Sequence, residues 1–564
     1  MLALVNSEDA RRPSRRRPLS QALADLLATL GIEIAFGVTG APIAPFVHAL
    51  EDHALIRWVP SRTEGGAVME AIGAFRVTGR PVLVVTTCGP GILGTRQALE
   101  IAGGEGVPMV VVSPLIPAAE RDRRAPQDAR ISADYASAGQ VFDLVAAVEA
   151  PEQLAPLASA LAAGLSRRTG FLAHVLVAGD LFDEPAPAFS LPRFRTAELA
   201  AGAAVVDEVI ELLAAHRFFV LAGRGAHGDA ELVRALVDVT GCPVVTTPGA
   251  KGVIDEHGSS WLGVTGIGGC GDVVARLRAY GAELALVLGS RLGGASVTPA
   301  LLSLPEFGLV QVDRDPASVR PGGDVDTLFV QSELRPFLES LLHRRDRLVR
   351  RPLEVTLTSC GAPVVEGAPP AGVVRPEALM DAIQRVVVDG SDAPVLVDVG
   401  TSWPWATSLL RFAHPRRFRL ESLVGSMGLA VSSAVGEAIG RHGKVVAITG
   451  DWSFDMALPE LRTAVDQDAP VVWIVLQNFG GRMVVDGDRE VHGRTESSAR
   501  FRRADLAGAA QSFRAGATCV TAEADLLPAL VEAMEAAGPY VVEVVVDTSR
   551  MPPYSERFDA LRRK

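Results

Sequence analysis

An acidic side chain and an amide side chain follow two consecutive apolar segments in the C-terminal third of the chain. Asp451 comes after KVVAITG (444–450), and Asn478 comes after PVVWIVLQ (470–477). Because parallel strands end at the same edge of a sheet, we expect both side chains outside that edge, where ligands bind. Carboxylate, amide and carbonyl oxygens are the ligands that Mg²⁺ prefers, and Gly480 adds a backbone carbonyl. The pattern predicts a site for a metal ion that bridges the protein and a phosphate group.

The residues around Asp451 are expected to lead from the strand into a helix. Gly450, Asp451, Trp452 and Ser453 supply the turn, and ALPELRTAV (457–465) supplies the helix. A helix N-terminus offers free N–H groups and a positive dipole end to a phosphate. Taken singly, the acidic residue reads as a helix cap and the amide as a turn residue, and only their pairing at this spacing favours a metal site.

The composition indicates an α/β protein of several domains. At 564 residues, of which 48% are hydrophobic and 21% charged, the chain is too long for one core. Short apolar segments such as PVLVVTT (81–87) and PVLVDVG (394–400) alternate with helical patterns, which is typical of parallel strands covered by helices. Pro-rich stretches near 181–194 and 360–376 interrupt the pattern. We therefore expect three doubly wound parallel-sheet domains, at residues 18–183, 195–347 and 374–548.

Charge and hydropathy argue against two classes of protein. The net charge of −12 disfavours a nucleic-acid binder, because phosphate contacts need clustered Lys and Arg, and the one basic cluster (11–17) reads as a polar tail. No apolar run reaches the about 18 residues that span a membrane, and Asp25 and Glu33 interrupt the segment that a signal peptide would need. The five cysteines are scattered, which predicts reduced thiols in a cytoplasmic protein.

The strand-end pair resembles a known cofactor motif. Gly450-Asp451-Trp452, the 25 residues 453–477 and then Asn478 are similar to the diphosphate and magnesium motif of thiamine diphosphate enzymes, usually Gly-Asp-Gly, some 25 residues, Asn-Asn. The flanking residues look like the acetolactate synthase, pyruvate oxidase and benzoylformate decarboxylase branch. The resemblance implies bound thiamine diphosphate and Mg²⁺. Trp452 replaces the third glycine, and because Trp does not easily adopt a positive φ, the turn must be ordinary in φ or reshaped.

A second segment resembles the family's activating region. SRTEGGAVMEAIGAFRVTGRPVLVVTTCGPG (61–91) is similar to the stretch around the glutamate that hydrogen-bonds the pyrimidine ring of the cofactor. The resemblance implies that Glu64 is this catalytic residue and that the N-terminal domain binds the pyrimidine. Without the surrounding match, Glu64 would read as a surface residue at a helix start.

A third segment, ESLVGSMGLAVSSAVGEAIG (421–440), looks like the family's Gly-x-Met-Gly region, in which an apolar side chain wedges beneath the cofactor. Met427 matches the wedge, although a lone Met is usually core filling. The resemblance implies that Gly425, Ser426 and Met427 bind the cofactor, with backbone groups of Gly425 and Met427 holding the aminopyrimidine. The C-terminal domain would then hold the diphosphate. DVGTSW (398–403) ends another strand and implies further diphosphate contacts from Gly400, Thr401 and Ser402.

The resemblance also implies an assembly. In the family, the pyrimidine and diphosphate surfaces come from different subunits, which implies a homodimer or homotetramer with active sites at the interface. GRGAHGD (223–229) and LGSRLGG (288–294) are similar to the central domain, which holds FAD or a nucleotide in some members and nothing in others. A lone Gly-x-Gly is weak evidence, so FAD is not favoured.

The reaction that the resemblance implies is decarboxylation of a 2-oxo acid, with pyruvate as the default donor, followed by protonation or capture by a carbonyl acceptor. Several positions depart from acetolactate synthase: Thr63 replaces His, Gly94 replaces Asn, and Pro126-Gln127-Asp128 replaces Phe-Gln-Glu. Gln127 is a candidate for orienting substrate, with a solvent-facing loop residue as the alternative.

These departures leave three functions open. The first is an acetolactate synthase-like carboligase or decarboxylase, in specialised or in housekeeping metabolism. The second is a lyase for 2-hydroxyacyl-CoA or a related thioester. The third is a catalytically weakened homologue that serves as a regulatory subunit, an idea motivated by Trp452.

Overall fold

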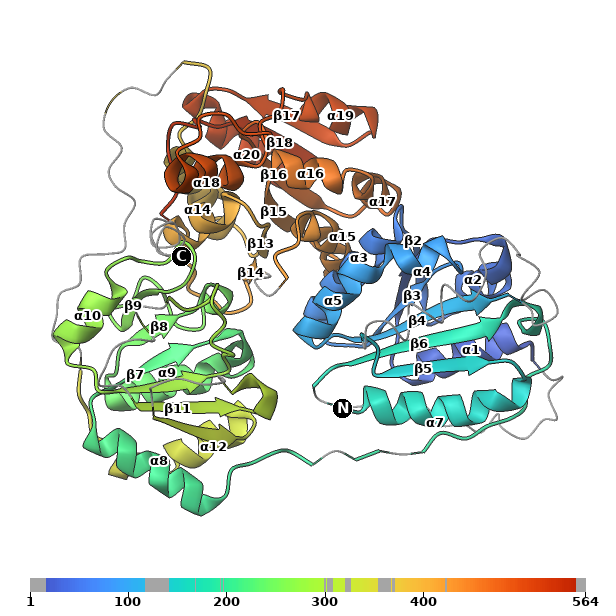
Figure 1. Cartoon of the computed structure of the whole chain (residues 1–564), viewed down its shortest axis with the longest axis horizontal. Coiled ribbons are helices and arrows are strands. Elements are labelled where there is room, and N and C mark those ends of the chain that lie inside the picture. The colour runs from blue at the N-terminus through green and yellow to red at the C-terminus, as the bar shows by residue number, and fades with distance from the viewer. Residues whose placement is uncertain are drawn as a thin grey trace. The chain divides into compact units, whose positions relative to one another are not determined.

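The computed structural model describes residues 17–116, 141–167, 169–192, 194–195, 197–298, 301, 308–319, 326–352, 367, 371–420 and 424–553. The chain divides into two compact units, Met1–Thr196 and Ala197–Lys564. The first unit contains one six-stranded sheet and the second contains two (Figure 1). Every strand pair in the three sheets is parallel. Three parallel sheets flanked by helices confirm the predicted fold class.

The sheet of the first unit has the strand order β2-β1-β3-β4-β6-β5. Its strands are β1 (Ile34–Gly37), β2 (Arg57–Pro60), β3 (Val82–Val85), β4 (Pro108–Leu115), β5 (Leu144–Val148) and β6 (Phe171–Ala178). Its helices are α1 (Leu19–Thr29), α2 (Ala44–Glu51), α3 (Glu64–Thr78), α4 (Pro90–Gly94), α5 (Arg96–Glu105) and α7 (Leu154–Leu165). Most strand positions are buried, as expected for a sheet covered on both faces.

The first sheet of the second unit has the order β12-β11-β10-β7-β8-β9, which is the Rossmann arrangement of two βαβαβ halves that diverge from β7 and β10. Its strands are β7 (Phe218–Ala222), β8 (Val244–Thr246), β9 (Trp261–Val264), β10 (Leu284–Leu288), β11 (Gly308–Asp313) and β12 (Thr327–Gln331). Its helices are α8 (Ala203–Ala215), α9 (Ala230–Thr240), α10 (Val273–Tyr280) and α12 (Leu334–Leu342).

The last sheet has the order β14-β13-β15-β16-β18-β17. Its strands are β13 (Val395–Val397), β14 (Phe418–Leu420), β15 (Val445–Gly450), β16 (Val471–Gln477), β17 (Gly516–Val520) and β18 (Tyr540–Val545). Its helices are α13 (Pro376–Ile383), α14 (Ser402–Leu409), α15 (Leu429–Arg441), α16 (Asp451–Met456), α17 (Glu460–Asp466), α18 (Arg482–His492), α19 (Leu506–Ser512) and α20 (Leu526–Glu535).

The first and last sheets share one topology. Numbered from its own first strand, each has the order 2-1-3-4-6-5. The order reverses between the first and third strands, and loops on either side of such a switch point leave in opposite directions and open a crevice at the carboxyl ends. In the last sheet this point lies between β13 and β15. The candidate metal ligand Asp451 follows β15 directly.

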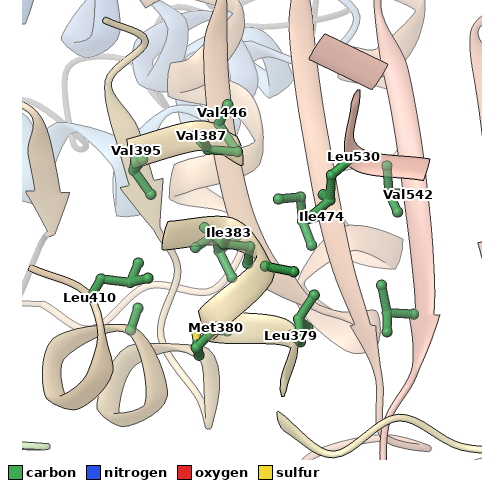
Figure 2. Close-up of a cluster of buried hydrophobic side chains, with 14 of the residues drawn as sticks. Leu379, Met380, Ile383, Val387, Val395, Leu410, Val446, Ile474, Leu530 and Val542 are labelled. Carbon is green, nitrogen blue, oxygen red and sulfur yellow. The ribbon is translucent and has the colours of Figure 1, made fainter. Parts of the chain in front are cut away.

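A continuous apolar cluster anchors the last sheet. Alternate strand residues, such as Val446 and Ile448 or Ile474 and Leu476, point to one face because side chains alternate along a strand. Figure 2 shows this cluster, in which Leu379, Met380 and Ile383 of α13 and Leu530 of α20 lie with Val395, Val446, Ile474 and Val542 of the sheet. Residues of β13, β15 and β16 all belong to this buried cluster, so the core packing positions the residues at their carboxyl ends.

The expectation that all cysteines are reduced is wrong, as Cys270 shows. Cys88, Cys242 and Cys519 are free thiols. Cys270, in the loop between β9 and α10, is disulfide-bonded. A disulfide depends on the approach of two backbones in space, which the spacing of cysteines along a chain does not reveal.

No helix among the described residues is long and apolar enough to cross a membrane.

Candidate active site

The carboxyl ends of β15 and β16 bring the two predicted metal ligands side by side. Gly450 pairs with Leu476 in the register of the sheet, and Asp451 and Asn478 follow within two residues. The predicted four-residue turn is absent, because β15 runs through Gly450 and α16 begins at Asp451 itself. Trp452 lies in the first turn of this helix and is not among the residues with positive φ. The backbone between β15 and α16 is therefore ordinary in φ at Trp452, and this residue causes no backbone strain there.

The carboxylate of Asp451 is held by backbone amides. Its Oδ1 accepts from the N–H of Trp452 at 2.8 Å, and its Oδ2 accepts from the N–H of Gly480 at 3.0 Å. Burial raises the pKa of Asp451 to about 6, while these hydrogen bonds favour its ionised form. The contact with Gly480 also ties the loop after β16 to the start of α16. A hydrogen bond therefore joins the two parts of the predicted site, Asp451 at the start of α16 and the loop that follows β16.

The side-chain amide of Asn478 completes an oxygen cluster. One of its terminal atoms lies 3.2 Å from Asp451 Oδ1 and 2.8 Å from the carbonyl oxygen of Gly480, and the other lies 3.1 Å from Thr401 Oγ1. With the amide oxygen toward Asp451, three oxygens converge without a proton between them, which is repulsive unless a cation lies among them. With the amide rotated by 180°, its NH₂ group donates to both oxygens instead.

The separations in this cluster fit a small divalent cation. An octahedron with metal–oxygen bonds of about 2.1 Å has edges of about 3.0 Å, close to the separations at Asn478. Among the described residues, no group of three or more His, Cys, Asp or Glu side chains could hold a metal ion. A set of one carboxylate, one amide and one carbonyl is instead what Mg²⁺ uses when phosphate and water supply its remaining ligands. The residues thus fit both Mg²⁺ and a diphosphate.

The loop after β13 reaches the same place. Thr401 contacts the Asn478 amide through its hydroxyl group, and Gly400 adopts a φ of +100°, which a residue with a side chain rarely does. The hydroxyl group of Ser402 donates to the carbonyl oxygen of Asp398 at 2.9 Å. This bond ties the start of α14 to the end of β13, so the Ser402 hydroxyl group has a structural role in the loop between them. Thr401 lies at the oxygen cluster, and its contact with a diphosphate stays a prediction.

Asp398 is a site residue that the sequence reasoning missed. It is 2% exposed, and its Oδ2 accepts from the N–H of Gly428 at 2.9 Å and from Thr449 Oγ1 at 3.3 Å. It therefore connects the start of the β13 loop with the Gly-x-Met-Gly segment and with β15 just before Asp451. An acidic residue directly after a buried apolar strand was the signal that could have found it.

The segment that contains Met427 packs beside α16. Gly425 and Gly428 both have positive φ, and a Cβ on Gly428 would lie 3.2 Å from the Cβ of Ala457. Ser426 is buried, whereas Met427 is partly exposed. The glycines let the chain turn closely over α16, and Asp398 holds this turn through the Gly428 N–H. The segment from Gly425 to Gly428 thus lies near the end of the sheet from which α16 begins.

Asp398 predicts a dependence of stability on pH. Burial raises its pKa to about 7, well above its ordinary value near 4. The folded protein then holds a proton that the unfolded chain releases, so the contribution is complete below about pH 4 and is lost as the pH rises through about 7, by up to about 4 kcal/mol. Asp398→Asn should therefore gain in unfolding midpoint relative to wild type between pH 5 and pH 8. Asp392→Asn, at a side chain that is 92% exposed, should not, and parallel pH profiles of wild type and Asp398→Asn would contradict the assignment.

Glu64 belongs to the first unit and begins α3. Thr63 caps this helix, because its Oγ1 accepts from the N–H of Gly66 at 2.9 Å. The carboxyl group of Glu64 lies over helix α4: a Cβ on Gly94 would come within 3.2 Å of Oε2, and one on Gly91 within 3.5 Å of Oε1. The two glycines thus let this carboxyl group approach helix α4 closely. Any side chain at position 94 would crowd it.

These contacts account for two departures from acetolactate synthase. Thr63, where His is usual, is a helix cap, and Gly94, where Asn is usual, allows the close approach of the Glu64 carboxyl group. The third departure, at Pro126-Gln127-Asp128, lies outside the described residues, so Gln127 remains a prediction.

The glycine-rich loops of the Rossmann sheet pack against each other at its switch point. A Cβ on Gly223 would lie 2.3 Å from the carbonyl oxygen of Gly289, and Gly225 donates its N–H to the same oxygen at 3.0 Å. Close backbone packing therefore explains these glycines without a bound cofactor. They give no support for FAD.

Three parts of the chain match one enzyme family. Residues 17–136, 206–341 and 398–544 match, respectively, the N-terminal TPP binding domain, the central domain and the C-terminal TPP binding domain of the thiamine pyrophosphate enzymes. These segments follow the same order as the three sheets.

Relatives and a solved structure match over most of the chain. The chain is 29% identical to the acetolactate synthase of Mycobacterium bovis over 482 residues, covering 82% of this chain and 76% of that protein. It is 26% identical to the acetolactate synthase large subunit of Corynebacterium glutamicum, covering 96% and 89%. The crystal structure of benzoylformate decarboxylase from Polynucleobacter necessarius superposes with a TM-score of 0.81 at 18% identity, covering 95% of this chain and all of that one, which shows a common fold. With all three domains matched in order, the chain belongs to the thiamine pyrophosphate enzyme family.

Proposed function

We propose that the protein is a thiamine diphosphate- and Mg²⁺-dependent enzyme that decarboxylates a 2-oxo acid and joins the remaining acyl carbon to a carbonyl acceptor. Pyruvate is the default donor. The observation that carries the proposal is the oxygen cluster of Asp451, Asn478 and the Gly480 carbonyl at the end of the last sheet. When bound, thiamine diphosphate supplies the carbon nucleophile and accepts the electron pair released with CO₂.

The residues of this chain would bind, orient and protect that cofactor. Asp451, Asn478 and Gly480 would hold Mg²⁺, and Gly450, Trp452 and Ser453, with the loop at Gly400, Thr401 and Ser402, would surround the diphosphate. Gly425, Ser426 and Met427 would support the rings. Glu64 would hold a proton in a hydrogen bond to the pyrimidine nitrogen, with Gln127 as a substrate-orienting residue.

The domains proposed for these roles are residues 18–183 for the pyrimidine and 374–548 for the diphosphate, with 195–347 between them. Self-association as a homodimer or homotetramer would bring Glu64 of one copy to Asp451 of another. A regulatory, inactive role has less support. Trp452 motivated it, yet this residue lies in an ordinary helix and leaves the oxygen cluster intact.

The acceptor is proposed to differ from that of acetolactate synthase. Where that branch has Asn, this chain has Gly94, which lies against the carboxyl group of Glu64 and presents no side chain there. This change supports a role in specialised metabolism rather than in branched-chain amino-acid synthesis. The acetolactate synthase relatives support C–C bond formation as the outcome.

Proton NMR of the purified protein with thiamine diphosphate, Mg²⁺ and pyruvate tests the function. We expect pyruvate to disappear and acetolactate or acetoin to form. Acetaldehyde alone would reduce the proposal to a decarboxylase. If calorimetry shows bound cofactor but pyruvate persists, the donor is another 2-oxo acid or an acyl thioester, and the pyruvate assignment is wrong. If the cofactor does not bind at all, the proposed function fails.

A further inference from the structure

The indole of Trp452 packs directly on the loop that carries the Gly480 carbonyl. A Cβ on Gly481 would lie 2.8 Å from Cζ3 and 3.0 Å from Cε3 of the indole, so only a glycine fits beneath the ring. The φ of Gly481 is −74°, a value open to any residue, so this glycine serves the contact rather than the backbone conformation. Trp452 and Gly481 are therefore complementary in shape.

A second aromatic residue holds the same indole from the side. The rings of Trp452 and Phe501 meet edge to face, with centroids 4.8 Å apart and planes at 85°. This is a favourable geometry for aromatic pairs. Phe501 in turn donates its N–H to the carbonyl oxygen of Phe479 at 2.9 Å, and Gly481 donates to the carbonyl oxygen of Ala499 at 2.9 Å. The stretch 499–501 thus pairs with the metal-binding loop 478–481.

The loop between these supports has a strained backbone. Phe479 has a φ of +65° and Gly480 a φ of +118°, and a Cβ on Gly480 would lie 2.1 Å from the carbonyl oxygen of Ala499. Such conformations persist only where the surroundings impose them. One support is the hydrogen bond from the Gly480 N–H to Asp451. The other is the aromatic contact, since Trp452 neighbours Asp451 in sequence and covers Gly481.

We propose that Trp452 is a positioning residue for the metal site: its side chain holds the loop that carries the Gly480 carbonyl and does not itself contact the metal ion. The indole packs Gly481 against Ala499 and Phe501, and so holds the Gly480 carbonyl oxygen beside the side-chain amide of Asn478, 2.8 Å from it. The usual motif has glycine at this third position. Here the packing of the Trp452 side chain would hold the loop in its place. This inference rests on the proposed Mg²⁺ and diphosphate site and adds to it a role specific to this chain.

Mg²⁺ titration in the presence of saturating thiamine diphosphate, followed by calorimetry, tests the role without recourse to turnover. We expect Trp452→Ala to weaken Mg²⁺ binding about tenfold, as is usual when a residue supporting a metal ligand is removed. Trp452→Phe keeps a ring over Gly481 and should bind within about threefold of wild type. Met456→Ala, at an exposed apolar residue of the same helix, should bind like wild type.

A double-mutant cycle with Gly481→Ala separates positioning from general destabilisation. Gly481→Ala alone should weaken Mg²⁺ binding, because the new Cβ strikes the indole. In the Trp452→Ala background that clash is gone, so the same change should cost much less. The two effects would therefore be clearly non-additive, as for residues in direct contact. If the contact served only the stability of the fold, the variants would lower the unfolding midpoint, but their effects on Mg²⁺ affinity would be additive.

Two results would overturn the role of Trp452: wild-type Mg²⁺ affinity in Trp452→Ala, or additive effects in the cycle. Both presuppose that the wild-type protein binds thiamine diphosphate with Mg²⁺. If it does not, the proposed function itself has failed, and the two failures are thus distinguished. Should Trp452→Ala not fold, Trp452→Phe compared with Gly481→Ala still decides, because the former should bind well and the latter poorly.

Discussion

Glu64→Gln is expected to lower turnover by about 10²- to 10⁴-fold, the range typical of a lost acid–base group. The amide has nearly the shape of the carboxyl group and packs in the same way against Gly91 and Gly94, so α3 and its cap at Thr63 should stay intact. An amide, however, cannot hold an acidic proton against a pyrimidine nitrogen. Steady-state rates, together with cofactor affinity from calorimetry, measure the two effects separately.

The matched control is Glu100→Gln. Glu100 lies in the same unit and forms a surface ion pair with Arg96, with 47% of its side chain exposed. Such pairs contribute little, so turnover should hardly change. If Glu64→Gln retained wild-type turnover with the cofactor bound, the catalytic assignment of Glu64 would be wrong.

Asp451→Ala is expected to weaken the Mg²⁺-dependent binding of thiamine diphosphate by at least about 100-fold. Removal of a residue that only supports a metal ligand already costs about 10- to 100-fold in metal affinity. The change removes one oxygen of the cluster and also the acceptor that holds the Gly480 N–H. It should equally abolish the rise in thermal unfolding midpoint that bound cofactor causes. Asp455→Ala, one turn along α16 and exposed, should bind the cofactor normally. Normal Mg²⁺-dependent binding by Asp451→Ala would remove Asp451 from the site.

Mixing the two variants tests where the complete site forms. If Glu64 of one copy faces Asp451 of another, a mixed dimer has one intact site and one doubly changed site. Random reassortment makes half the dimers mixed, so activity should recover to about a quarter of wild type. If Glu64 and Asp451 of the same chain formed each site, every site would carry one lesion, and the mixture would stay inactive.

Regular features of the fold were predictable from the sequence because they depend on local pattern. Short apolar runs bounded by Gly and Pro predicted buried parallel strands, and the structure has β3, β13, β15 and β16 there. The shared topology of the first and last sheets was not visible, since strand order depends on pairing between distant segments. The disulfide at Cys270 was missed for the same reason.

The candidate site divides in a similar way. Residue types at strand ends pointed to Asp451, Asn478 and Gly480, and to Glu64 by resemblance, because a ligand needs particular oxygens at the ends of particular strands. The sequence by itself determined the enzyme family, and it predicted the ligand set. Only the tertiary structure decided how the oxygens converge, that α16 starts at Asp451, and that Asp398 joins the two loops. The role proposed for Trp452 likewise rests on its contacts with Gly481 and Phe501, residues 29 and 49 positions away. Such contacts arise only once the sheet has formed, because packing brings together side chains that no local pattern relates.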